Sequence, residues 1–233
     1  MRNTLARKRD VLSVLLKTDL GFHGSNTGYG PHSIHAYAAK FPPQLPSFFI
    51  EALTAQGQVV LDPMAGSGTT AVEALRLGRR AITCDIDALA SLITRVKCSG
   101  VDPRLAQEAL DKASWRAHTL LSQQGAVLLQ SLSERFDEES RDFLTFWFDG
   151  QVQLELMALL TAIEEEPDPK IRDFLKLLFS SIIMTKSGGV SWARDLAHSR
   201  PHKDLTKHLR HPLADYCKRG KKAIESVSSW PEA

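Results

Sequence analysis

Residues 59–87 of the chain read VVLDPMAGSGTTAVEALRLGRRAITCDID, and this stretch decides the fold. An apolar run ends at Asp62, a loop of small residues follows, a helix-forming segment closes at Gly78, and a second apolar run ends on acids. The order predicts strand, loop, helix and strand, which is typical of a parallel sheet. A loop of Gly and Ser lets the backbone approach a ligand closely, and the following helix N-terminus offers unpaired N–H groups. We therefore expect a site for a nucleotide-like cofactor at the carboxyl end of the sheet.

The acids beside this loop narrow the kind of cofactor. Asp85 follows the loop at about the 20-residue separation at which a carboxylate binds ribose hydroxyls in dinucleotide folds. The loop lacks the Lys-Ser/Thr pair of a P-loop, and Asp62 would repel a phosphate but suits a cationic amino group. S-adenosylmethionine, which carries an ammonium and a sulfonium, fits both carboxylates. A plain tight turn is the alternative reading, and the combination of Asp62, Pro63, Gly66, Gly68 and Asp85 argues against it.

Two motifs carry a family resemblance. LDPMAGSGTTAVEA resembles the cofactor loop of S-adenosylmethionine-dependent DNA amino-methyltransferases, which reads approximately D-P-F-x-G-S-G-T-T, with Met64 here in place of the usual Phe. Upstream, SIHAYAAKFPPQLPSFFIEAL resembles the companion cofactor motif of these enzymes. The two motifs in this order resemble the N4-cytosine/N6-adenine group over residues 32–100. The resemblance implies a set of cofactor-binding residues, namely Tyr37, Lys40, Phe41, Pro42, Asp62, Pro63, Met64, Gly66, Ser67, Gly68, Thr69 and Asp85.

The catalytic element of the family is a later S-P-P-Y/W or D-P-P-Y tetrapeptide, and we do not find it. The only Pro-Pro pair is Pro42-Pro43, which lies upstream of the cofactor loop. Only two strands are evident, fewer than the sheet of such a domain requires. The catalytic residues are therefore unknown, the chain resembles the front portion of a larger methyltransferase, and a second chain could supply the missing strand. A half-sheet would also leave an unpaired edge, which favours aggregation or pairing with another subunit.

The function favoured by the resemblance is methylation of an exocyclic amino group of a DNA base, cytosine N4 or adenine N6. One alternative is a non-catalytic, split or truncated module that binds S-adenosylmethionine and DNA. A further alternative is an RNA guanine methyltransferase, because those enzymes share a D-P-M-x-G-S-G-T loop that Met64 fits. They usually carry an RNA-binding domain upstream, and the HAYAAKFPP segment favours the DNA group.

Around these motifs the chain divides into three expected regions. Residues 1–30 form an N-terminal helix and an irregular segment, residues 31–102 form the cofactor-binding β/α portion, and residues 103–233 are helical with a basic C-terminal segment. Within the last region, helical periodicity extends to about Lys186, and a loop is expected over residues 187–204. The expected fold class is α/β, with a partial Rossmann-like methyltransferase sheet and a largely helical C-terminal half.

Composition adds further expectations. The chain is 43% hydrophobic and 24% charged, as in ordinary globular proteins, and no apolar run approaches the roughly 20 residues that span a bilayer. Three widely spaced cysteines fit reduced thiols, so we expect a cytoplasmic protein without membrane association. The histidines lack the spacing of a metal site, so none is expected. Trp115, Trp147 and Trp192 are expected to be packing residues.

The C-terminal region is basic. From Arg194 to Lys222 there are nine Lys and Arg against three acids. Such a segment is the electrostatic footprint of a nucleic-acid surface, although a solvated helix face is the alternative reading. The residues predicted to contact DNA are Arg200, Lys203, Lys207 and Arg210.

Overall fold

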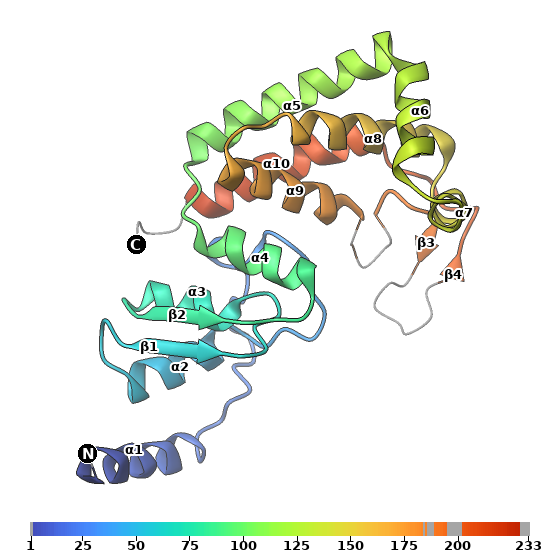
Figure 1. The fold of residues 1–233 in the computed structure, drawn as a ribbon. Coiled ribbons are helices and arrows are strands. Elements are labelled where there is room, and N and C mark those ends of the chain that lie inside the picture. Colours follow the sequence, from blue (N-terminus) through green and yellow to red (C-terminus); the bar gives the residue numbers. More distant parts are fainter. Residues whose placement is uncertain (1, 184, 186–188, 195–201, 229–233) are drawn as a thin grey trace. The chain divides into compact units, whose positions relative to one another are not determined.

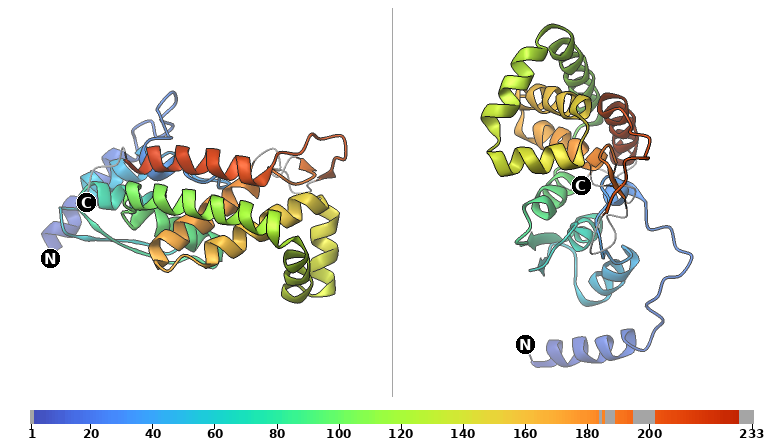
Figure 2. Two further views of the ribbon diagram at one scale, coloured as in Figure 1. Left: turned by 90° about the horizontal axis from the view of Figure 1, so that it is seen from above. Right: turned by 90° about the vertical axis from the view of Figure 1, so that its right-hand side faces the viewer.

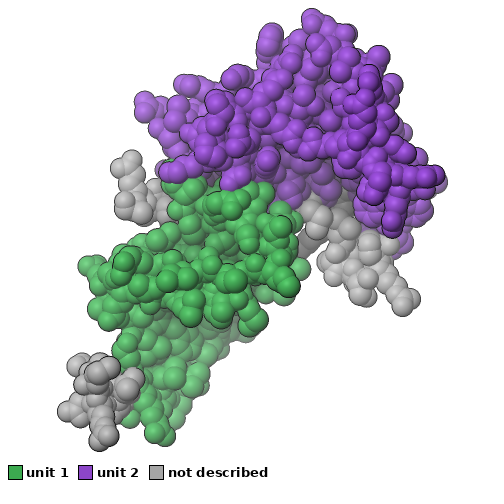
Figure 3. Space-filling view, in the orientation of Figure 1, with its two compact units in different colours: residues 1–33, 37–100, 229–233 green, residues 34–36, 101–228 purple. Residues whose placement is uncertain are grey.

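The computed structural model describes residues 2–183, 185, 189–194 and 202–228. Within this part of the chain, residues 2–33 and 37–100 form one compact unit, and residues 34–36 and 101–228 form a second (Figure 3). No helix among the described residues has both the length and the apolar character needed to cross a membrane.

The first unit is an α/β arrangement around a pair of parallel strands. Its elements are α1 (Arg2–Leu15), η1 (Gly30–Ser33), α2 (Gln44–Leu53), β1 (Val59–Asp62), α3 (Thr69–Arg76), β2 (Arg80–Thr83) and α4 (Ala88–Cys98). β1 pairs with β2 from Val59 opposite Arg80 to Asp62 opposite Thr83, and α3 is the crossover between them (Figure 1). The predicted order of strand, loop, helix and strand is confirmed, and so is the α/β class.

One face of this strand pair is exposed. Exposure alternates along both strands, as a period of two requires, and α3 packs against both of them. Three of the four outward residues are apolar, namely Val59 at 45% exposure, Leu61 at 66% and Ile82 at 57%, and the fourth is Arg80. Leu61 lies directly opposite Ile82 in the register. Parallel strands are normally covered on both faces, so this apolar surface is unusual for them.

The second unit is mainly helical. It contains α5 (Pro103–Gln123), α6 (Gly125–Arg135), α7 (Glu138–Trp147), α8 (Gly150–Glu164), α9 (Pro169–Ile183) and α10 (Pro212–Ser228). α5, α8, α9 and α10 pack on one another (Figure 2), which confirms the largely helical C-terminal half. Asp102, Asp137 and Asp149 each accept a backbone N–H at the start of α5, α7 and α8. These caps explain why the helices begin where they do.

The packing of this unit contains one close approach and two departures from prediction. A Cβ on Gly220 of α10 would lie 2.4 Å from a methyl of Leu110 on α5, so glycine lets the two helices touch. The predicted loop of residues 187–204 contains a short antiparallel ladder, β3 (Ala193–Arg194) with β4 (His202–Lys203), which is too brief to leave an alternating pattern. The packing role predicted for Trp115 is wrong, because its side chain is 69% exposed on the outside of α5.

Candidate cofactor site

The loop between β1 and α3 depends on two left-handed glycines. Gly66 has φ 51° and Gly68 has φ 73°, a region that other residues enter only with strain. Gly68 also has no room for a side chain, because a Cβ would lie 2.7 Å from Oγ1 and 3.0 Å from Cα of Thr94. Gly68 precedes α3, whose first turn has no side-chain cap. The helix therefore presents backbone N–H groups and the positive end of its dipole at the loop.

The acid that follows β2 holds this loop. The Gly66 amide donates to Oδ2 of Asp85 at 2.7 Å, and the Asp87 amide donates to Oδ1 at 2.9 Å. These backbone bonds, that from Asp87 first, hold the pKa of Asp85 below its usual value. Each oxygen keeps a second lone pair, so the carboxylate can still accept hydrogen bonds from two ribose hydroxyls.

Two side chains of α4 hold the same loop from the other side. Thr94 Oγ1 donates to the Gly66 carbonyl at 3.2 Å, and Lys97 Nζ donates to the Ser67 carbonyl at 2.8 Å. Lys97 is only 5% exposed, and its burial, helped by the charge of Lys40, lowers its pKa to about 7. Sequence reasoning missed both residues. Their spacing of three, which places them on one face of a helix, is the signal that could have pointed to them.

The upstream segment reaches the loop through Tyr37. A Cβ on Gly66 would lie 3.2 Å from the Tyr37 ring, and the phenol donates to Oδ2 of Asp87 at 3.4 Å. The Lys40 ammonium donates to the His32 carbonyl at 2.9 Å, and burial lowers its pKa. Phe41 is 41% exposed. The Pro42 carbonyl accepts a hydrogen bond from the Leu45 amide at the start of α2. The structure thus brings Tyr37 to the loop, while the ammonium of Lys40 braces the segment itself.

The remaining predicted residues divide into exposed and buried side chains. Asp62 is partly exposed, with Oδ1 accepting the Met64 amide at 3.2 Å, and the Pro63 side chain faces solvent. Met64 is 84% exposed. Ser67 and Thr69 are instead buried, with their hydroxyl oxygens 3.4 Å apart. Ser67 and Thr69 can therefore offer a ligand little beyond their backbone.

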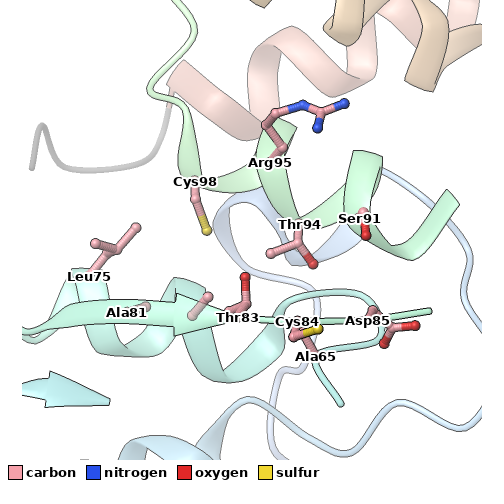
Figure 4. Close-up of a pocket in the computed structure, with 11 residues that line it drawn as sticks. Ala65, Leu75, Ala81, Thr83, Cys84, Asp85, Ser91, Thr94, Arg95 and Cys98 are labelled. Carbon is pink, nitrogen blue, oxygen red and sulfur yellow. The ribbon is translucent and has the colours of Figure 1, made fainter. Parts of the chain in front are cut away.

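A pocket of about 380 Å³ opens beside Asp85 (Figure 4). It lies between the end of β2, α3 and α4, and its volume suits a small organic molecule. Its lining includes the predicted Asp85 but not Tyr37 or Asp62. The lining residues are Ala65, Ala71, Leu75, Ala81, Thr83, Cys84, Asp85, Ser91, Thr94, Arg95 and Cys98.

Three of the four predicted DNA-binding residues are described, and these lie in the second unit with their charged groups in contact with protein partners. Lys203 Nζ lies 4.5 Å from the ring centroid of Phe146. Lys207 donates to the carbonyls of Ser191 and Ala193 at 2.6 and 3.1 Å. Arg210 pairs with Asp215 at 3.1 Å, and Arg200 lies outside the described residues. Across the described part of the chain, no group of three or more His, Cys, Asp or Glu could hold a metal.

Comparison with known proteins finds one matching family model and several similar methyltransferases. The family model described as DNA methylase matches residues 14–94, which contain both motifs of the site. A type II methyltransferase of Kocuria varians, M.MvaI, is 30% identical over 170 residues, 70% of this chain and 36% of that protein. M.MjaII of Methanocaldococcus jannaschii is 39% identical over 71 residues, 30% of this chain and 13% of that protein. M2.DpnII of Streptococcus pneumoniae is 43% identical over 65 residues, 26% of this chain and 24% of that protein.

The chain thus spans little more than a third of the first of these relatives, and less of the other two. No solved structure matches it. The match to DNA methylases does not favour the alternative of an RNA guanine methyltransferase.

Proposed function

We propose that the chain is the cofactor-binding portion of a DNA amino-methyltransferase, because residues 14–94 match the family model described as DNA methylase. In this proposal residues 31–102 bind S-adenosylmethionine, and β1 and β2 are part of a Rossmann-like methyltransferase sheet. The reaction is transfer of the cofactor's methyl group to cytosine N4 or adenine N6 of DNA.

The observation that carries the proposal is the turn at Gly66 and Gly68, which is tied to Asp85 and lies at the uncapped start of α3. Asp85 would bind the ribose hydroxyls, with the pocket beside it receiving part of the adenosine. Asp62, at the end of β1, would attract the ammonium of the methionine end. Tyr37, whose ring lies over Gly66, would line the part of the site that binds the methionine end of the cofactor. Backbone N–H groups at the start of α3 would bind the carboxylate of the cofactor.

Calorimetric titration of the chain with S-adenosylmethionine tests this assignment, with adenosine triphosphate as the matched ligand. We expect micromolar binding of S-adenosylmethionine. We expect no measurable binding of the triphosphate, because Asp62 repels phosphate and the loop has no P-loop lysine. A folded chain that does not bind S-adenosylmethionine, or that binds both ligands with equal affinity, contradicts the proposal.

The exposed strand face supports a second part of the proposal. Val59, Leu61 and Ile82 present apolar side chains to solvent, although parallel strands are usually buried on both faces. A two-stranded sheet is also marginal by itself. We propose that further structure, from another segment or a second chain, completes the sheet and supplies the Pro-Pro-aromatic strand. The known relatives are long enough to contain such structure, because this chain covers 36% of the first.

Among the described residues, we propose Lys203 as the residue that contacts DNA. Its ammonium lies beside the ring of Phe146, and the Phe146 side chain is 51% exposed. A cation on an exposed aromatic ring suits both the phosphates and the bases of nucleic acid. Lys207 and Arg210 would have to give up protein partners to serve the same purpose.

A further inference from the structure

A buried carboxylate lies behind the cofactor loop. Glu73 of α3 has no solvent exposure. Its Oε1 accepts hydrogen bonds from the phenol of Tyr29 at 2.8 Å and from Nε2 of His32 at 2.9 Å. Its Oε2 accepts from Nε of Arg76 at 2.8 Å. We refer to these four residues as the Glu73 cluster. A buried carboxylate with this many donors has both oxygens satisfied, which is what its burial requires.

The charge state of the cluster follows from these bonds. Burial alone would raise the pKa of Glu73, but the bonds from His32, Arg76 and Tyr29 hold it below its usual value. Burial lowers the pKa of His32, so its ring is neutral and donates through Nε2. Burial and the bond to Glu73 raise the pKa of Tyr29, so the phenol keeps its proton. Glu73 and Arg76 therefore form one ion pair, to which two neutral donors are added.

The cluster joins segments that are distant in the sequence. Tyr29 directly precedes η1 and His32 lies within it, whereas Glu73 and Arg76 come from α3. Arg76 also donates to Ser47 Oγ of α2 at 2.6 Å. The ring of Tyr29 packs edge-on against that of His32, with centroids 5.0 Å apart. One carboxylate thus fixes the upstream segment and, through Arg76, α2 to the helix that begins at the cofactor loop.

The same upstream segment leads to the methionine end of the proposed site. The His32 carbonyl accepts the Lys40 ammonium, which ties the cluster to residues further along. Tyr37 lies between these two positions in sequence, and its ring lies over Gly66. Tyr37 thus lies in the sequence between His32, which is anchored at Glu73, and Lys40, which is bonded to His32.

We propose that Glu73 is a positioning residue for the cofactor, which holds Tyr37 against the loop through the segment that Lys40 braces. The inference rests on the proposed function and adds a specific claim to it. Loss of the cluster should weaken recognition of the methionine end of S-adenosylmethionine and spare recognition of the adenosine end at Asp85.

The test compares two ligands on three variants of the whole chain. Tyr29→Phe removes one hydrogen-bond donor to Glu73. Glu73→Gln removes the negative charge and places an amide N–H group against the donors that Glu73 accepts from. Tyr216→Phe is the matched control, because this buried phenol donates to the Leu175 carbonyl in the second unit. The ligands are S-adenosylmethionine and methylthioadenosine, which lacks the amino-acid end. Calorimetry gives both affinities, and thermal unfolding reports on the fold.

We expect Tyr29→Phe and Glu73→Gln to weaken S-adenosylmethionine binding by roughly tenfold, the equivalent of one hydrogen bond. Methylthioadenosine affinity should stay within about twofold of wild type in both variants, a change too small to report a lost contact. Tyr216→Phe should lower the unfolding midpoint and leave both affinities unchanged.

The outcomes separate this inference from the proposed function. Unchanged S-adenosylmethionine affinity in Tyr29→Phe and Glu73→Gln, with normal binding by wild type, overturns the positioning role alone. Equal weakening of both ligands also overturns it, since a general structural defect would do the same. If Glu73→Gln does not fold, Tyr29→Phe decides. A folded wild-type chain that does not bind S-adenosylmethionine overturns the proposed function and this inference together.

Discussion

The amide of Gly66 donates to the carboxylate of Asp85 across 2.7 Å, which joins the loop after β1 to the acid after β2. Asp85 therefore has a structural task besides any contact with a ligand. The residue that would bind ribose also shapes the loop that would bind the rest of the cofactor.

Substitutions of Asp85 should separate these tasks. Asp85→Ala removes the acceptor for both amides, so we expect a lower unfolding midpoint and loss of S-adenosylmethionine binding. Asp85→Asn keeps one acceptor oxygen, so the loop should persist while affinity falls by at least about tenfold, because a ribose acceptor is lost. Calorimetry and thermal unfolding check both variants. If Asp85→Ala has the unfolding midpoint and the S-adenosylmethionine affinity of the wild type, the loop does not depend on this contact.

Gly68 and Gly78 offer a matched pair, because both have φ 73°. Alanine at either position should cost about 1–2 kcal/mol for the left-handed backbone. Gly68→Ala also forces a Cβ to within 2.7 Å of Thr94, whereas the nearest atom to a Cβ on Gly78 is the Gln56 side chain at 3.5 Å. We expect Gly68→Ala to abolish S-adenosylmethionine binding and Gly78→Ala to leave it intact in calorimetry. Equal affinities in the two variants would contradict the assigned role of the loop.

Lys97 should make stability depend on pH. Its pKa falls from 10.5 in the unfolded chain to about 7 in the folded protein, so between these values the unfolded chain binds the additional proton. Stability from this group is therefore lost as pH falls through that window, by about 1.4 kcal/mol per pH unit.

Lys97→Met removes this dependence. Urea unfolding at pH 6, 8 and 10 gives the free energy of unfolding of both proteins. We expect the stability of the variant relative to the wild type to rise as pH decreases, although the variant also loses the hydrogen bond to the Ser67 carbonyl. Parallel stability curves for the two proteins would mean that Lys97 stays charged when buried. Lys176→Met, which replaces a partly exposed lysine of α9, is the control.

The exposed strand face should drive self-association. Leu61→Lys adds a charge to that face opposite Ile82, and we expect the chain to become more monomeric in light scattering, with a stability change within about 0.5 kcal/mol. Leu105→Lys on α5, at a site 50% exposed, is the control and should change nothing. If both variants associate as the wild type does, the face is not the contact surface.

The chain by itself should transfer no methyl group to DNA. No Pro-Pro-aromatic element follows the cofactor loop in this sequence, and our proposal assigns the acceptor for the exocyclic amine to the structure that completes the sheet. Incubation with S-adenosylmethionine carrying a labelled methyl group and with mixed-sequence duplex DNA should leave the DNA unlabelled. Labelled DNA would show that other residues of this chain perform catalysis.

Local patterns predicted much of this structure. The small residues between two apolar runs marked β1, the loop, α3 and β2, and the apolar spacing after Pro103 marked the helices up to α9. These features depend on neighbours in sequence, and sequence shows neighbours directly. The caps at Asp102, Asp137 and Asp149 are also local, although we did not predict them.

The rest depends on contacts between distant residues. Glu73 resembled any helical acid, and only the fold brings Tyr29 to it from 44 residues away. Lys207 resembled a free surface cation, yet it donates to two carbonyls of the segment that contains β3. Trp115 looked like a packing residue by type, but it faces out from α5, since helical position rather than residue type sets exposure.

The apolar surface at Leu61 and Ile82 also has a consequence for the amount of this chain that is present in a cell. In a cell, a copy of this chain with that surface uncovered would be more prone to aggregation and degradation than a copy whose surface is covered. Its steady-state amount would then be limited by the amount of the structure that completes the sheet. If that structure is a second chain, two polypeptides produced in unequal quantity would in this way be brought to equal numbers, without any regulator acting on their genes.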